Sequence, residues 1–176
     1  MAACSAALLV SLGACASESA SELTEPSEQA LVVSPALLFE ANWFTGNFFV
    51  SFLDVNPTVT CPAQISAFEG SSTWSDPTTG ALRYYTNGIS LRNAAGTELA
   101  ANLAGNSTAT ETAVFVPVPG APDRLFVFSN NTTSVFVSTL DTSNDTLISP
   151  PTLVATNTGE AIGGVADDAN GLWLVL

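Results

Sequence analysis

Two carboxylates, Glu69 and Asp76, are the pair of side chains in this sequence that could act together as acid and base. Such a pair can hydrolyse a glycosidic bond when the two groups face each other about 5–10 Å apart. Asp76 is followed by Pro77, however, and aspartate followed by proline is typical of the start of a type I turn. We therefore expect Asp76 to hold a turn between two strands, and we assign no catalytic residue.

Two other segments, Asp141–Asp145 and Asp167–Gly171, carry the oxygen-bearing side chains of a calcium loop. Neither has the alternating ligands or the distal glutamate of an EF-hand, so we expect both to be hairpin turns. Gly163 and Gly164 lack the lysine and the spacing of a phosphate-binding loop. The sequence therefore predicts no metal site and no cofactor site.

Six aromatic side chains could together form a surface on which sugars stack. Their placement along the expected strands instead favours packing between sheets, because alternate strand residues face opposite sides. The six residues are Tyr84, Tyr85, Phe126, Phe128, Phe136 and Trp173.

The composition excludes several classes of function. The 176-residue chain has a formal net charge of −13, no histidine and three cationic side chains, Arg83, Arg92 and Arg124. A chain this acidic has no electrostatic footprint for a phosphate backbone, so we expect no nucleic-acid partner. Without histidine there is no Ser–His–Asp or Cys–His catalysis and no imidazole ligand for zinc. Arg83 and Arg92 flank one expected hairpin, where they would balance nearby carboxylates.

The first residues have the pattern of an export signal. The apolar run Ala2–Leu12 is shorter than the roughly 20 residues of a membrane span but suits the core of a secretory signal. It ends in Leu12–Cys15 (LGAC), which resembles the bacterial lipobox, in which the cysteine is acylated and becomes the mature N-terminus. We therefore expect residues 1–14 to be a lipoprotein signal peptide and Cys15 to be lipidated. No Lys or Arg precedes the run, so plain secretion and a buried N-terminal helix stay as alternatives.

Residues 15–36 are acidic, rich in serine and free of aromatic side chains. Low hydrophobicity with charge of one sign predicts a disordered tether, which we favour over a calcium or partner site. Once Cys4 leaves with the signal and Cys15 carries lipid, Cys61 has no partner for an intramolecular disulfide. Because no basic neighbour lowers its pKa, we expect Cys61 to be a small buried residue rather than a nucleophile.

Residues 37–176 have the pattern of an all-β domain. Short runs rich in Val, Phe, Tyr, Leu and Thr alternate with Gly, Pro, Asn and Asp, which is typical of strands and turns. Asn87-Gly88 is a strong signal for a β-hairpin. The expected strands cover residues 48–53, 81–86, 89–92, 113–116, 125–129 and 134–138.

One motif, a leucine followed by an aromatic-rich strand, occurs at Leu82, Leu125 and Leu172. The spacings are 43 and 47 residues, and a period of about 40–50 residues is typical of β-propeller blades. A seven-stranded sandwich also has evenly spaced short strands, but it does not repeat one motif at blade spacing. The sequence therefore predicts a partial β-propeller of about three four-stranded antiparallel blades over residues 37–176.

Several segments resemble, in order, a propeller-like region of secreted surface proteins of Bacteroidetes and related bacteria, many of them exported by type IX secretion. The similar segments are Trp43–Asn47, Glu69–Asp76, Gly80–Gly88, Leu103–Thr108, Val116–Gly120, Leu125–Ser129 and Gly171–Val175. The resemblance implies a surface module and implies no enzymatic activity. The family's domain usually continues for further blades, and the lipobox is a second departure from its pattern.

Closing a propeller takes at least four blades. A chain with about three blades is therefore expected to be a fragment, or to form a ring that further chains complete. We expect a lipoprotein of the bacterial cell envelope, anchored by lipid at the outer membrane or cell surface. Its propeller would be a non-catalytic binding or scaffolding module, with a protein or polysaccharide ligand at the loops of the blades. The alternative is a fragment of a secreted propeller hydrolase that acts on a polysaccharide or a lactone.

Overall fold

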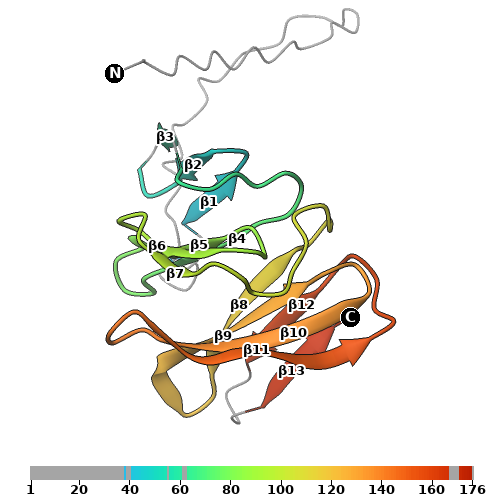
Figure 1. Cartoon of the computed structure of the whole chain (residues 1–176). Helices are drawn as coiled ribbons and strands as arrows, with labels where there is room; N and C mark the ends of the chain where they lie inside the picture. Colours follow the sequence, from blue (N-terminus) through green and yellow to red (C-terminus); the bar gives the residue numbers. More distant parts are fainter. Residues whose placement is uncertain (1–37, 39–40, 55, 61–62, 167–170, 176) are drawn as a thin grey trace, which may run out of the picture. The chain divides into compact units, whose positions relative to one another are not determined.

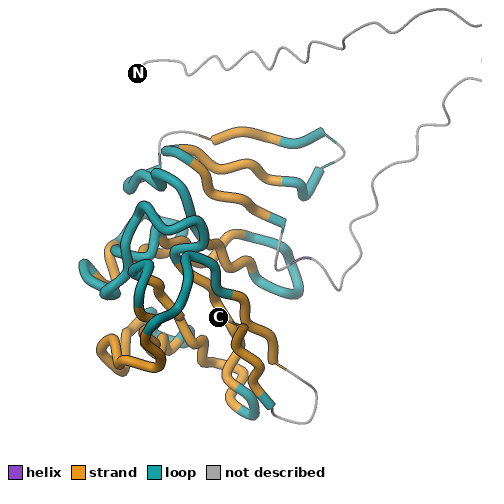
Figure 2. Tube along the Cα trace, turned by 90° about the vertical axis from the view of Figure 1, so that its right-hand side faces the viewer, coloured by secondary structure: helices purple, strands orange, loops and turns teal. Residues whose placement is uncertain are grey.

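The computed structural model describes residues 38, 41–54, 56–60, 63–166 and 171–175, all of them in the unit that spans residues 33–176 (Figure 1). The expected signal peptide, the lipidation site Cys15, the tether and Cys61 lie outside the described residues. The described part is all-β, as the sequence predicts, and strands joined by loops account for nearly all of it (Figure 2).

Thirteen strands are present in the described residues. They are β1 (Asn42–Thr45), β2 (Phe48–Ser51), β3 (Thr58–Thr60), β4 (Ser72–Ser75), β5 (Leu82–Thr86), β6 (Leu91–Asn93), β7 (Glu98–Ala100), β8 (Ala113–Val118), β9 (Ala121–Asn130), β10 (Ser134–Asp141), β11 (Thr146–Thr156), β12 (Gly163–Ala166) and β13 (Leu172–Val175).

The strands form four antiparallel sheets in the order of the sequence. The first sheet is β1-β2-β3, the second β4-β5-β6-β7, the third β8-β9-β10-β11 and the last β12-β13. The repeated leucine motif begins β5 at Leu82, lies within β9 at Leu125 and begins β13 at Leu172. The repeat therefore marks the second strand of three successive sheets.

A separate hydrophobic core lies between each pair of successive sheets. Tyr85 packs with Phe44 and Ala67 between the first and second sheets, whereas Tyr84, its neighbour in β5, packs with Phe115 between the second and third. Because successive side chains of a strand face opposite sides, one strand supplies both cores. The core between the third and last sheets contains Val116, Phe128, Val135 and Ile162.

The first strands of the four sheets also contact one another in sequence order: β1 packs beside β4, β4 beside β8, and β8 beside β12. The buried Asn42 side chain joins the first two sheets, because its Nδ2 donates to Ser75 Oγ at 2.9 Å and to the Gly80 carbonyl oxygen at 2.7 Å. Thr73 adds a hydrogen bond from its hydroxyl to the Asn42 carbonyl oxygen. Polar contacts as well as packing therefore hold β1 against β4.

The hairpin predicted at Asn87-Gly88 is confirmed, but its loop has four residues rather than two, because Thr86 pairs with Leu91. Asn87 Oδ1 closes the loop by accepting from the Ile89 and Ser90 amides at 3.1 and 2.9 Å. Gly88 has a φ of +80°, which a residue with a side chain rarely adopts. The loop therefore requires both the asparagine and the glycine.

The sequence predicts that Trp173 packs between sheets, and this prediction is wrong: the Trp173 side chain is 65% exposed. In β13 it is Leu174 that packs against the core around Val116. Trp173 and Val175 project from the opposite face, beside Val165 of β12. The packing prediction is confirmed for Tyr84, Tyr85 and Phe128, which are buried.

Candidate functional site

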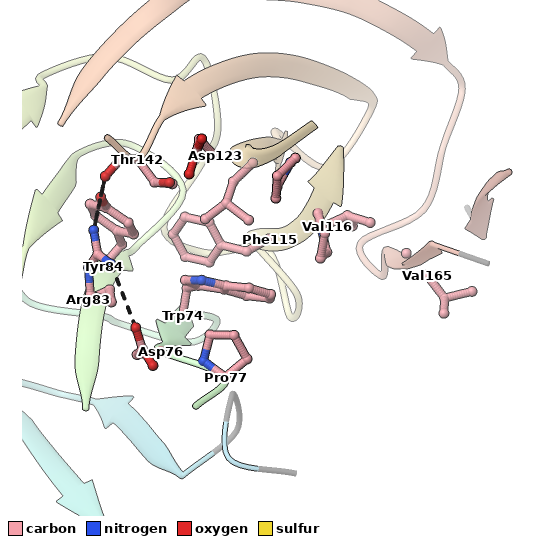
Figure 3. Close-up of a pocket in the computed structure, with 14 residues that line it drawn as sticks. Trp74, Asp76, Pro77, Arg83, Tyr84, Phe115, Val116, Asp123, Thr142 and Val165 are labelled. Atoms are coloured by element: carbon pink, nitrogen blue, oxygen red, sulfur yellow. Dashed lines mark hydrogen bonds and ion pairs between the residues drawn. The ribbon is translucent and has the colours of Figure 1, made fainter. Parts of the chain in front are cut away.

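A cavity of about 680 Å³ lies where the second, third and last sheets meet (Figure 3). Its volume is in the range of about 300–1,000 Å³ typical of small-molecule sites. The residues that line it come mainly from the ends of β4 and β8, the start of β5, the first half of β9 and the turn after β10. They are Trp74, Asp76, Pro77, Arg83, Tyr84, Phe115, Val116, Pro117, Pro122, Asp123, Leu125, Thr142, Gly164 and Val165.

One part of the cavity wall is apolar. Trp74 is packed against the core that contains Phe115, and both side chains line the cavity (Figure 3). Pro117 and Pro122, on either side of the tight turn between β8 and β9, extend this wall. Since proline and packed aromatic rings have little rotamer freedom, the wall keeps its shape without a ligand.

Arg83 supplies the positive charge of the cavity. Its Nη2 donates to the Thr142 carbonyl oxygen at 3.0 Å and to Tyr84 Oη at 3.2 Å. Its Nη1 lies 3.8 Å from Asp76 Oδ2, and the two side chains are 41% and 28% exposed. The guanidinium is therefore fixed by one nitrogen, while the other remains accessible beside a carboxylate.

Asp76 forms the turn that the sequence predicts. Its Oδ1 accepts from the Thr78 and Thr79 amides, each at 2.9 Å, and its carbonyl oxygen accepts from the Gly80 amide. The hydrogen bonds from the Thr79 and Thr78 amides, with a smaller contribution from Arg83, lower the pKa of Asp76. The side chain is therefore an ionised acceptor at neutral pH and does not suit the role of a general acid.

A buried tyrosine holds the turn that carries Thr142. Tyr84 Oη donates to Asp145 Oδ1 at 2.6 Å, and Asn93 Nδ2 donates to Asp145 Oδ2 at 2.9 Å. Burial, together with the hydrogen bond to Asp145, raises the pKa of Tyr84 to about 12. The hydrogen bonds from Tyr84 and Asn93 lower the pKa of Asp145. The network joins β5 and β6 to the turn between β10 and β11.

Glu69 and Asp76 do not form a catalytic pair. The first precedes β4 and the second follows it, and an extended four-residue strand alone spans about 13 Å. Asp76 lines the cavity, and Glu69 does not.

The segment Asp141–Asp145 is the hairpin turn that the sequence predicts. Asp141 Oδ1 accepts from the Ser143 amide and hydroxyl. Of the other calcium-loop candidate, Asp167–Asn170 lies outside the described residues. Among the residues that the structure describes, no group of three or more His, Cys, Asp or Glu side chains could hold a metal ion.

The expected roles of Arg83 and Arg92 are confirmed. Arg83 pairs with Asp76, and Arg92 Nη2 lies 2.7 Å from Glu98 Oε2. The third arginine, Arg124, lies in β9.

Sequence reasoning missed most of the lining residues, among them Trp74, Phe115 and Asp123. One signal was present: an adjacent aspartate and proline occur in the turn after β4, at Asp76-Pro77, and at the start of β9, at Pro122-Asp123. Both pairs lie near the connection between the first and second strands of a sheet, and the structure brings them to one cavity.

No helix in the described part of the chain has both the length and the apolar character needed to span a membrane. In comparisons with known proteins, the chain matches no family model, no curated protein and no solved structure.

Proposed function

We propose that this protein is a lipid-anchored component of the bacterial cell envelope whose folded part is an incomplete β-propeller. In this proposal the propeller binds a ligand at the loops of its blades and catalyses no reaction.

The observation that carries the proposal is the contact of β1 with β4, of β4 with β8 and of β8 with β12. Propeller blades are antiparallel sheets arranged around a central channel, and the first strand of each blade is the one nearest that channel. A core between each pair of successive sheets is the packing that neighbouring blades require. The second and third sheets would be full blades, and the first and last partial ones.

The anchor is supported by the sequence alone. The small residues before Cys15 have the lipobox pattern, and the acidic segment 15–36 has the composition of a flexible spacer. A lipid chain followed by a spacer would hold the folded domain away from the membrane surface.

A binding role is supported by the cavity rather than by any reactive group. The low pKa of Asp76 and the placement of Glu69 beyond the other end of β4 leave the hydrolase alternative without an acid–base pair among these two residues. A preformed wall with a few fixed polar groups is typical of a ligand site.

Metabolic labelling with a palmitate analogue in a bacterial host tests the anchor. The wild-type protein and a Cys4→Ala control are expected to take up the label, whereas Cys15→Ala is expected to take up none. Label that persists in Cys15→Ala would overturn the anchor.

A further inference from the structure

We propose that the cavity beside β4 and β8 binds an uncharged polysaccharide, with Trp74 against a sugar ring and Asp76, Arg83 and Asp123 hydrogen-bonded to the sugar hydroxyl groups. This inference rests on the binding role proposed above and names the class of ligand.

The apolar wall suits the C–H face of a sugar ring. Aromatic rings carry partial negative charge on their faces, which attracts the partially positive hydrogens of such a face. Trp74, in the first strand of the second sheet, lines the cavity (Figure 3). Phe115, in the first strand of the third sheet, is only 6% exposed and supports Trp74 from the core. Pro117 and Pro122 continue the same apolar surface.

The polar groups suit hydroxyls. The Thr78 and Thr79 amides both donate to Asp76 Oδ1, so Asp76 Oδ2 has neither of these backbone donors and lies beside Arg83. Arg83 keeps Nη1 as a donor, because its recorded hydrogen bonds are all from Nη2. A hydroxyl both donates and accepts, so neighbouring hydroxyls of one sugar can bridge this carboxylate and this guanidinium. The 3.8 Å separation of Nη1 and Oδ2 leaves both atoms available to a ligand.

Charge distinguishes neutral from charged polysaccharides. Asp76 and Arg83 compensate each other within the cavity, so neither offers an unpaired charge to an ionic ligand. Asp123 and the formal net charge of −13 repel a polyanion, such as a polyuronate. An uncharged polysaccharide needs no unpaired charge in the cavity and is not repelled by the negative charge of the protein.

The positions of the Arg83 guanidinium and of the turn that contains Thr142 are fixed without a ligand. The Thr142 carbonyl oxygen holds the guanidinium of Arg83, and Tyr84 holds the turn of Thr142 through Asp145. Such preorganisation reduces the ordering cost of binding, which is what a weakly interacting, hydroxyl-rich ligand requires.

Fluorescence of the full chain tests the inference. The chain has three tryptophans, so Trp43→Phe with Trp173→Phe leaves Trp74 as the single emitter. The titrants are cellotetraose, xylotetraose, laminaritetraose and maltotetraose, with polygalacturonate as the polyanion. The buffer contains about 150 mM salt, which largely screens long-range electrostatic forces and leaves the charges of the cavity to discriminate between them. At least one neutral tetrasaccharide is expected to change the Trp74 emission saturably, and polygalacturonate is not.

Matched variants assign the binding to the cavity. Arg83→Lys keeps the charge but loses the planar fork, so it is expected to weaken binding by about tenfold. Arg92→Lys, on the same hairpin but outside the cavity, is expected to leave binding unchanged. Asp123→Asn is expected to weaken binding, and Asp54→Asn, an exposed carboxylate outside the cavity, is not.

Three results would overturn the inference: no response of the folded protein to any neutral tetrasaccharide, an equal or stronger response to polygalacturonate, or equal weakening by Arg83→Lys and Arg92→Lys. If any one of them is observed while palmitate labelling still depends on Cys15, the sugar ligand is refuted and the lipid anchor is not.

Discussion

The Tyr84 hydroxyl donates a 2.6 Å hydrogen bond to Asp145, which is 61 residues further along the chain. Asp145 lies in the turn between β10 and β11, with a φ of +56°, and it also accepts from Asn93. The same turn presents the Thr142 carbonyl oxygen to Arg83. One buried hydroxyl thus couples the packing of two successive sheets to the position of the charged group in the cavity.

Tyr84→Phe is expected to lower the free energy of unfolding by about 1–2 kcal/mol, because Asp145 loses a charge-assisted hydrogen bond while the aromatic packing is retained. The measurement is urea unfolding followed by circular dichroism. Tyr85→Phe is the matched control, since Tyr85 is equally buried in the next position of β5 and no hydrogen bond of its hydroxyl is recorded among the described residues. Equal losses in the two variants would contradict the role given to the hydroxyl.

Stability at alkaline pH is expected to depend on Tyr84. Its pKa in the folded protein is raised to about 12, mainly by burial, against about 10 in an unfolded chain. The folded state therefore holds this proton more tightly, and the stability that depends on it is complete below pH 10 and lost as the pH rises toward 12. Urea unfolding at stepped pH is expected to show this loss, and Tyr84→Phe to reduce it. An unchanged slope in that variant would exclude Tyr84 as the group responsible.

At acid pH the stability is expected to change with pH in the opposite direction. Hydrogen bonds from Tyr84 and Asn93 lower the pKa of Asp145 in the folded protein, so its contribution is present above the unfolded value of about 3.9 and is lost as the pH falls through the folded value. Asp145→Asn is expected to flatten the dependence of stability on pH below 4. Glu111→Gln, at an exposed carboxylate, is the control. A dependence on pH that is the same in Asp145→Asn and in the wild type would contradict this assignment.

The strands that the sequence predicts correctly are those specified by local signals. Leu82–Thr86 and Ala113–Val118 are short apolar runs bounded by turn residues. The long strand Thr146–Thr156 was missed because it contains Pro150 and Pro151, which argue against a central strand. They are tolerated because β11 is the edge of its sheet and its pairing with β10 shifts register there.

The site is less predictable than the strands, because it depends on contacts between distant residues. Arg83 and Thr142 lie 59 positions apart, and no local pattern indicates that a backbone carbonyl will hold a guanidinium. The exposure of Trp173 is likewise set by which face of β13 packs against the third sheet. The periodicity of the sequence shows that alternate side chains of a strand share a face, but it does not show which face packs against another sheet.

Gly88→Ala is expected to lower the free energy of unfolding by about 2–4 kcal/mol. Gly88 has a φ of +80°, and a Cβ there would lie 2.7 Å from Thr112 Cβ and 2.9 Å from the Thr112 carbonyl oxygen. Backbone strain and a steric clash therefore act together. Thermal unfolding followed by circular dichroism measures the loss. Gly159→Ala is the control, because a Cβ at Gly159 would meet nothing within 4 Å. A loss under about 0.5 kcal/mol for Gly88→Ala would show that the loop relaxes freely.

The outer faces of the first and last sheets are expected to make the protein self-associate. Val165, Trp173 and Val175 share one face of β12-β13, and Val175 is 70% exposed. In the first sheet Trp43 and Val59 are also exposed, on strands that both pair with β2. Contiguous exposed apolar side chains on a sheet are typical of an interaction surface. Sedimentation velocity at increasing concentration is therefore expected to show species larger than the monomer.

Val175→Lys is expected to shift this equilibrium toward the monomer, because a charge at the contact must be desolvated when two faces meet. Phe68→Lys is the matched control: Phe68 is 76% exposed but lies in the loop before β4, outside both sheet faces, and single exposed apolar residues are ordinary on protein surfaces. If the wild type stays monomeric up to about 100 µM, where exposed strands usually associate, these faces do not drive association. If Phe68→Lys has the same effect as Val175→Lys, added charge alone, and not the face of β13, accounts for the change.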